Sequence, residues 1–189
     1  MMKCLFRTAG IVILMALASS AALAQAPGYG YIEGGYLNVN PDNFSGSGSN
    51  WYAEASKDLF KNFQISGRYL SGSYADDVDL SFWRIAAGWH GALGEKGDVV
   101  AEATWTSQDV DHVSDDGAGV TAGVRWRFIK MFEADGFVHW TDYGDAGSQD
   151  SYEVRAIFNV WRLGIGAAAE TSSDDKRYNA FLRFNFGKD

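Results

Sequence analysis

A two-residue alternation of apolar and polar side chains recurs along this chain and limits its possible folds more than any other feature. It is clearest over residues 98–108, which read Val99, Ala101, Ala103 and Trp105 on one face and Val100, Glu102, Thr104, Thr106 and Gln108 on the other. Successive side chains of a β-strand point to opposite faces, so the pattern predicts a strand with one apolar and one polar face. The alternation alone fits both a soluble β-sandwich and a membrane barrel.

The first residues have the composition of an export signal. Residues 1–24 combine two basic residues, an apolar stretch over 11–18 and the small-x-small sequence of 22–24. This arrangement is typical of a cleaved secretory signal peptide, and a retained membrane anchor is the alternative. We therefore expect residues 25–189 to form a single exported domain.

The composition of the chain narrows the choice further. Its one cysteine, Cys4, lies inside the predicted leader, so the exported domain is expected to have no disulfide. Aromatic residues make up 15% of a chain whose mean hydropathy is only −0.19. Many large aromatics at low hydropathy are expected of a barrel with a lipid-facing outside and a polar inside. The net charge of −8 argues against nucleic-acid binding.

Alternation divides the domain into ten predicted strands of an antiparallel, up-and-down transmembrane β-barrel. Each has about the 9–11 residues that a tilted strand needs to cross a bilayer. The predicted strands are 28–39, 49–59, 63–72, 79–91, 98–108, 118–129, 132–143, 150–160, 163–172 and 176–187. An eight-stranded barrel is the alternative, and it would require two segments within 150–187 to merge.

The predicted connections fall into two kinds that alternate along the chain. One kind is long or rich in Gly, Ser and Asp, and comprises 40–48, 72–78, 109–117, 144–149 and 173–175. The other is shorter and comprises 60–62, 91–97, 129–131 and 161–162. Outer-membrane barrels have long outer loops and short periplasmic turns. Aspartates gather at the predicted outer end and most lysines at the predicted periplasmic end.

The predicted outward face carries an aromatic girdle at each rim. The outer rim holds Tyr36, Trp51, Tyr69, Trp83, Trp105, Trp140, Tyr152 and Tyr178. The periplasmic rim holds Phe63, Trp89, Trp126, Phe128, Phe158 and Phe184. Small and aliphatic residues lie between the two sets. Two aromatic belts around an apolar band are typical of a lipid-facing barrel surface.

The predicted inward face carries a nearly balanced set of acidic and basic side chains. We expect the lumen charge network to consist of Glu33, Glu54, Arg68, Arg84, Glu102, Arg125, Arg127, Asp135, His139, Glu153, Arg155, Glu170 and Arg183, with His90 on the same face. Unpaired charges would be very costly in a soluble core, but inside a narrow barrel they can pair across the lumen. Side chains nearly fill barrels of about eight strands, so we expect a closed lumen, with an open pore as the alternative.

With these residues in place, the chain resembles the small Gram-negative outer-membrane β-barrel proteins of the porin-like families. The resemblance is carried by the first strand, Tyr31-Ile32-Glu33-Gly34-Gly35-Tyr36, and by the aromatic-rich last strand, Phe181-Leu182-Arg183-Phe184-Asn185-Phe186. It implies a place in the outer membrane, contact with lipid and lipopolysaccharide, and folding by the barrel-assembly machinery. These families have varied functions, so the resemblance leaves the function open.

No residue set in the sequence makes a convincing catalytic, cofactor-binding or metal site. His112-Val113-Ser114 resembles the His-x-Ser sequence of barrel lipid-A deacylases, but it lies in an Asp-rich connection. His139 and Asp142 resemble an outer-membrane protease pair, but the chain is much shorter than those enzymes. Asp76-Asp77 and Asp174-Asp175 could bind divalent cations weakly at the loops.

The sequence therefore predicts a non-enzymatic outer-membrane barrel with acidic outer loops, acting as an envelope structural or surface-interaction protein. The first alternative is a narrow passive channel for small solutes. The second is an outer-membrane enzyme that modifies lipid A.

Overall fold

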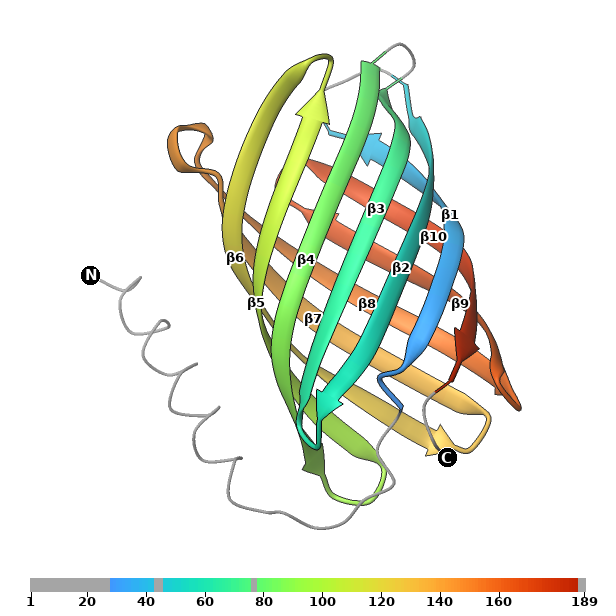
Figure 1. Ribbon diagram of the computed structural model, residues 1–189. Helices are drawn as coiled ribbons and strands as arrows, with labels where there is room; N and C mark the ends of the chain where they lie inside the picture. Colours follow the sequence, from blue (N-terminus) through green and yellow to red (C-terminus); the bar gives the residue numbers. More distant parts are fainter. Residues whose placement is uncertain (1–27, 43–45, 76–77, 187–189) are drawn as a thin grey trace.

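The sheet of this protein closes on itself. The computed structural model describes residues 28–42, 46–75 and 78–186, and within them ten strands form a closed antiparallel barrel. The strands are β1 (Tyr31–Pro41), β2 (Gly48–Phe60), β3 (Phe63–Ala75), β4 (Val78–Leu93), β5 (Gly97–Val110), β6 (Val113–Ile129), β7 (Phe132–Asp142), β8 (Ser148–Val160), β9 (Leu163–Ser172) and β10 (Asp175–Asn185). Each strand pairs with its neighbours in the chain, and β1 closes the barrel against β10 (Figure 1). The predicted fold class is confirmed.

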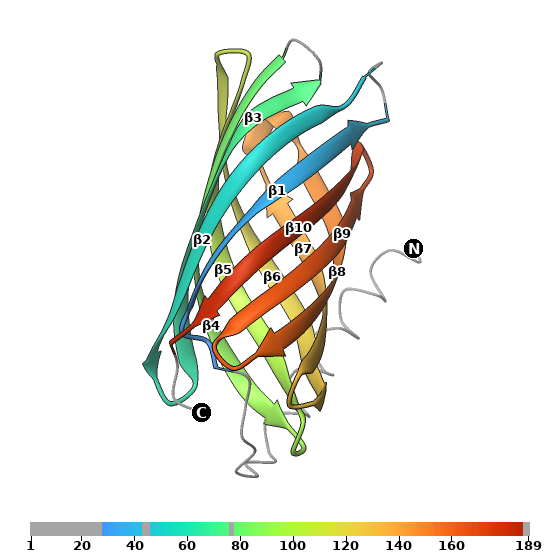
Figure 2. The same ribbon diagram turned by 90° about the vertical axis from the view of Figure 1, so that its right-hand side faces the viewer.

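The eight-stranded alternative is wrong. β8 and β9 pair with each other from Ser151↔Ser172 to Val160↔Leu163, so they are separate strands. Trp161 and Arg162 form the tight turn between them, and Trp161 adopts a positive φ of 56°. β1 lies between β2 and β10, as Figure 2 shows from the side, and pairs with β10 over its full length and with β2 from Tyr31 to Val39.

The two ends of the barrel differ in their connections. We call the end with the turns at 61–62, 94–96, 130–131 and 161–162 the turn end, and β1 starts and β10 stops there. We call the opposite end the loop end. It includes the 3-10 helix η1 (Gly144–Ala146). The predicted leader, Asp76-Asp77 and residues 187–189 lie outside the described residues.

The expected long connection over 109–117 is instead a hairpin tip. β5 and β6 continue to the pair Val110↔Val113, which leaves only Asp111 and His112 in the turn. Both turn residues have positive φ, 51° and 69°, as a type I′ hairpin turn requires. The Asp109 carboxylate accepts hydrogen bonds from the His112 N–H and the Ser114 hydroxyl, so polar residues taken for a loop stabilise the extended hairpin.

The barrel has a buried interior and an exposed apolar exterior. Interior apolar side chains form one cluster of Leu37, Val39, Tyr52, Leu70, Ile157, Ala168 and Phe181. On the outside, Trp51 and Trp83 each have 54% of their surface exposed, and the Tyr69 ring lies between them at centroid distances of 5.3 and 4.4 Å. Large exposed aromatic rings in register across β2, β3 and β4 make an apolar outer band, which a soluble surface rarely carries.

The aromatic residues assigned to the two girdles all lie on the outward-facing positions of their strands. Most are exposed, and Tyr69, Trp89 and Trp126 are partly covered by their neighbours. Within the described residues, no helix has the length and apolar character needed to cross a bilayer.

Adjacent glycines at the start of β1 serve opposite faces of the sheet. Gly35 faces the interior, where an added Cβ would lie 2.5 Å from the Ala180 carbonyl oxygen and 2.7 Å from a Tyr52 ring carbon. Gly34 faces outward, and the nearest atom to its added Cβ is 3.6 Å away. The inward position therefore requires glycine so that the Tyr52 ring can lie directly on the β1 backbone.

We expect Gly35→Ala to lower the free energy of unfolding by about 1–3 kcal/mol, because the methyl group would overpack the interior. Gly34→Ala is the matched control and should leave stability nearly unchanged. Urea unfolding of the refolded proteins, followed by tryptophan fluorescence, measures both. Equal effects of the two substitutions would contradict the assigned faces.

Candidate functional site

The centre of the lumen is organised around one buried carboxylate. Glu33 on β1 has 1% of its surface exposed. It accepts hydrogen bonds from Arg155 Nη2 at 2.7 Å, from Arg183 Nε at 2.8 Å and from the Tyr52 hydroxyl at 2.8 Å. These donors come from β8, β10 and β2, so a single side chain links four strands of the barrel. Two guanidinium groups compensate the charge and satisfy the oxygens of this carboxylate.

A second carboxylate, Glu54 on β2, is shared by two arginines. Its Oε2 atom lies 3.7 Å from Arg68 Nε and 3.7 Å from Arg84 Nη2. Both distances exceed hydrogen-bond length. The hydrogen bond that Glu54 accepts comes from the Tyr31 hydroxyl. Arg68 and Arg84 are direct cross-strand partners on β3 and β4, so two like charges face one acid.

A third acid joins the opposite side of the lumen to this network. Glu133 on β7 accepts a 2.6 Å hydrogen bond from Arg125 and lies 3.6 Å from Arg127. Arg183 Nη1 lies 4.0 Å from Glu133. Arg183 therefore connects Glu133 to the cluster of Glu33, Arg155, Arg183 and Tyr52, which we call the Glu33 hub. Asp135 lies beside Arg125 at 3.7 Å.

The remaining predicted network residues lie around this centre. Glu153 contacts His139 Nε2 at 3.5 Å and Arg155 Nε at 3.9 Å, and His139 Nδ1 shares a 2.8 Å hydrogen bond with Thr121. Two acids bind polar side chains on their own side of the lumen and do not reach the hub. Glu102 accepts from Gln64 at 2.6 Å, and Glu170 accepts from Ser151 at 2.7 Å.

The segment before β1 closes the turn end of the lumen. The Tyr29 ring has 3% of its surface exposed and stacks on His90 at a centroid distance of 3.9 Å. Its hydroxyl donates to Asp98 at 3.1 Å, and the Arg125 guanidinium lies 4.5 Å from the ring centroid. Burial raises the pKa of the Tyr29 phenol, so the hydroxyl keeps its proton and remains a donor.

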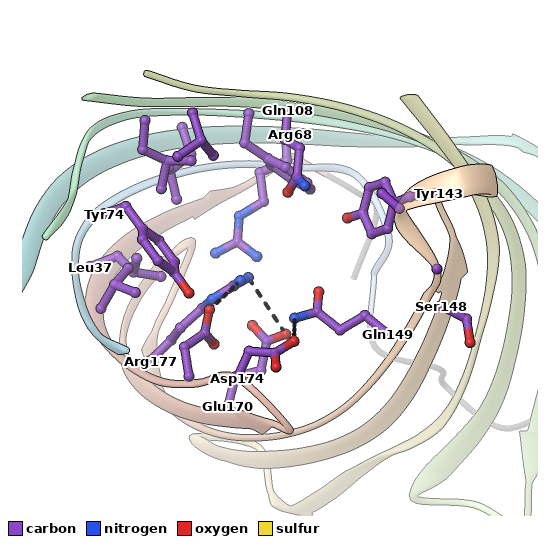
Figure 3. A pocket seen from close by; sticks show the side chains of 18 residues that line it. Leu37, Arg68, Tyr74, Gln108, Tyr143, Ser148, Gln149, Glu170, Asp174 and Arg177 are labelled. Atoms are coloured by element: carbon purple, nitrogen blue, oxygen red, sulfur yellow. Dashed lines mark hydrogen bonds and ion pairs between the residues drawn. The ribbon is translucent and has the colours of Figure 1, made fainter. Parts of the chain in front are cut away.

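Three cavities follow one another along the lumen. At the loop end lies a pocket of about 380 Å³, which we call the loop-end pocket (Figure 3). A middle cavity of about 60 Å³ shares Arg68, Phe82 and Arg177 with it. A lower cavity of about 40 Å³ shares Arg84 and His139 with the middle one, and Tyr29 lines it. The two lower cavities have room for little more than water.

Several residues that complete this lumen are absent from the predicted charge network. They are Tyr29, Tyr31, Tyr52, Asp98, Glu133, Asp175 and Arg177. The alternation could have identified Glu133, because it lies two residues from Asp135 and therefore faces the same side of the strand. The tyrosines also occupy inward-facing positions of the alternation, but the predicted network contained only charged residues and histidine.

The candidate catalytic pairs are not assembled in the structure. Ser114 donates its hydroxyl to Asp109 at 2.7 Å, whereas His112 occupies the exposed turn. His139 points into the lumen, whereas Asp142 is exposed and faces the opposite side of β7. Within the described part of the chain, no group of three or more His, Cys, Asp or Glu side chains could hold a metal ion.

We expect Glu33→Gln to lower the free energy of unfolding by about 3–5 kcal/mol, because two buried guanidiniums lose their compensating charge. Glu95→Gln, in an exposed turn, is the matched control and should change it by less than about 0.5 kcal/mol. Urea unfolding in detergent micelles measures both. A Glu33→Gln protein as stable as the control would show that the hub does not stabilise the barrel.

No family model matches this chain, and no curated protein matches it. Solved structures share its architecture. The KdgM porin is similar with a TM-score of 0.50 at 9% identity, over 82% of this chain and 99% of that one. An outer membrane channel from Pseudomonas putida F1 is similar with a TM-score of 0.51 at 11% identity, over 89% of this chain and 98% of that one. The chain thus has the fold of outer-membrane β-barrel porins, and at the level of fold the predicted resemblance is confirmed.

Proposed function

We propose that this protein is a non-enzymatic outer-membrane barrel with a closed lumen, which acts in envelope structure or surface interaction. The observation that carries the proposal is the Glu33 hub. Arg155 and Arg183 converge on this carboxylate inside the barrel at 2.7 and 2.8 Å. Together with the Glu54 and Glu133 clusters, the hub fills much of the described lumen below the loop-end pocket, where the middle and lower cavities measure about 60 and 40 Å³.

The exterior supports a place in the outer membrane. Exposed aromatic and aliphatic side chains cover the outward positions of the strands, among them Trp83, Val154 and Leu182. A bilayer would cover this band and remove it from water. The predicted signal peptide over 1–24 agrees with export. In this proposal the partners are outer-membrane lipid and lipopolysaccharide, with the barrel-assembly machinery acting during folding.

The charges at the two ends support a surface role for the loop end. Exposed aspartates at the loop end include Asp79, Asp111, Asp116, Asp142 and Asp145. The turn end instead exposes lysines, among them Lys61, Lys96 and Lys130. An acidic outer surface can bridge to the anionic lipopolysaccharide around it through weakly held divalent cations.

A narrow passive channel is the second candidate, and the cavities favour it. The loop-end pocket, the middle cavity and the lower cavity share wall residues in sequence along the lumen. The three cavities are therefore neighbours along the lumen, from the loop end to Tyr29. The KdgM porin and the outer membrane channel with this fold also fit a channel.

Conductance in planar lipid bilayers separates the two candidates. We expect the wild-type protein to insert without stable unitary currents, because arginine side chains and Tyr29 fill the constrictions. The double variant Tyr29→Gly, Arg155→Ser removes a large side chain at the turn end and one at the hub, so it should conduct. Stable unitary currents from the wild-type protein would overturn the closed-lumen proposal in favour of the channel.

A further inference from the structure

We propose that the loop-end pocket binds a small amphiphile whose carboxylate pairs with Arg68 and whose apolar body lies against the opposite wall. The inference goes beyond the proposed function, because the pocket opens toward the loop end whether or not the lumen below it conducts. Its volume of about 380 Å³ falls within the range of small-molecule sites, roughly 300–1,000 Å³.

One wall of the pocket is a continuous apolar surface. β1, β3, β4 and β5 supply it with Leu37, Val39, Leu70, Leu80, Phe82 and Val110. Leu80 and Phe82 pack against the buried interior cluster while still lining the pocket. Tyr74 and Gln108 from the same strands also line the pocket, but most of this wall is apolar, so it suits a hydrocarbon or aromatic body.

Arg68 supplies hydrogen-bond donors at the base of the pocket. Its side chain has 10% of its surface exposed, and within the described residues its Nε has no hydrogen-bond partner. The ion pair with Glu54 is long, 3.7 Å, and Glu54 is shared with Arg84. By contrast, Arg155 and Arg183 bind Glu33 at hydrogen-bond distance. Figure 3 shows Arg68 reaching into the pocket.

A carboxylate would satisfy what Arg68 lacks. The planar guanidinium can donate two parallel N–H groups to the two oxygens of one carboxylate. Such a charge-assisted pair is stronger than a hydrogen bond between neutral groups.

The other charges of the pocket are already engaged with one another. Arg177 donates to Asp175 at 2.8 Å and lies 3.9 Å from Glu170. Asp174, toward the mouth, accepts from Gln149 at 3.4 Å. These acids lie opposite Arg68 in Figure 3 and would repel a second negative charge on the ligand. The arrangement therefore selects a monocarboxylate over a polyanion.

The test compares three probes with the same aromatic body and different heads: phenylacetate, phenylacetamide and 2-phenylethylamine. The full-length protein in lipid nanodiscs is titrated with each by calorimetry, and empty nanodiscs correct for partitioning into lipid. We expect phenylacetate to bind at least about tenfold more tightly than the amide or the amine. No binding of phenylacetate at millimolar concentration, or equal binding of all three, would overturn the proposal.

Matched variants locate the head-group contact. Arg68→Gln should weaken phenylacetate binding at least about tenfold, to the level of the amide. Arg84→Gln is the control, because Arg84 shares Glu54 at the same 3.7 Å distance but does not line the pocket. It should leave binding within about twofold. Loss in both variants, or in neither, would contradict a direct contact with Arg68.

A variant away from the charge network keeps the test informative if Arg68→Gln fails to fold. Leu80→Asp places a carboxylate on the apolar wall near the loop end, where Leu80 pairs with Val110. It should abolish phenylacetate binding while the folded protein keeps its gel shift on heating. Unchanged binding in this variant would place the probe outside the pocket and overturn the proposal.

Discussion

The pairing of Glu33 with Arg155 and Arg183 is the interaction on which the interior of this barrel depends. The three residues come from β1, β8 and β10, which are adjacent or nearly adjacent only because the sheet closes between the two ends of the chain. Closure brings the charges together, and the charges in turn stabilise closure, since each would be costly to bury without the others. A sheet that stayed open between β1 and β10 would separate the Arg183 guanidinium from the Glu33 carboxylate.

The interior is not uniform along its axis, and this asymmetry follows from where the charges are paired. Near the turn end and the centre, long side chains from facing strands meet: Tyr29 with Asp98, Arg125 with Glu133, Arg155 with Glu33. Toward the loop end, Leu37, Leu70 and Phe82 line one side of the larger loop-end pocket. The barrel is therefore more tightly filled at its centre than above it. The proposed closed lumen and the loop-end pocket both follow from this distribution of side-chain length and polarity.

Strand parity explains how much could be predicted from the sequence. Alternation alone assigned Glu33, Arg155 and the other network residues to the inside and Trp51 and Trp83 to the outside, because side chains in a strand have only two directions. Parity does not say which inward residues meet. Glu33 and Arg155 are 122 residues apart, and their contact depends on strand tilt and register around the closed sheet. The hairpin tip at Asp111 and His112 was missed for a different reason. Polar, Asp-rich sequence indicates a loop on composition, but here Asp109 binds the turn and the alternation continues through it.

Neither the loop-end pocket nor the Glu33 hub could be inferred from the alternation of side chains. Alternation gives the direction of a side chain, whereas the pocket and the hub depend on which charged groups lie within hydrogen-bond distance of each other. Glu33 receives two guanidiniums at hydrogen-bond distance and is fully used. Glu54 Oε2 faces Arg68 and Arg84 at 3.7 Å and forms a hydrogen bond with neither of them, while the Tyr31 hydroxyl donates to the other oxygen. Of the two arginines, only Arg68 borders the loop-end pocket, so the arginine without a close carboxylate partner lies where the proposed ligand would bind.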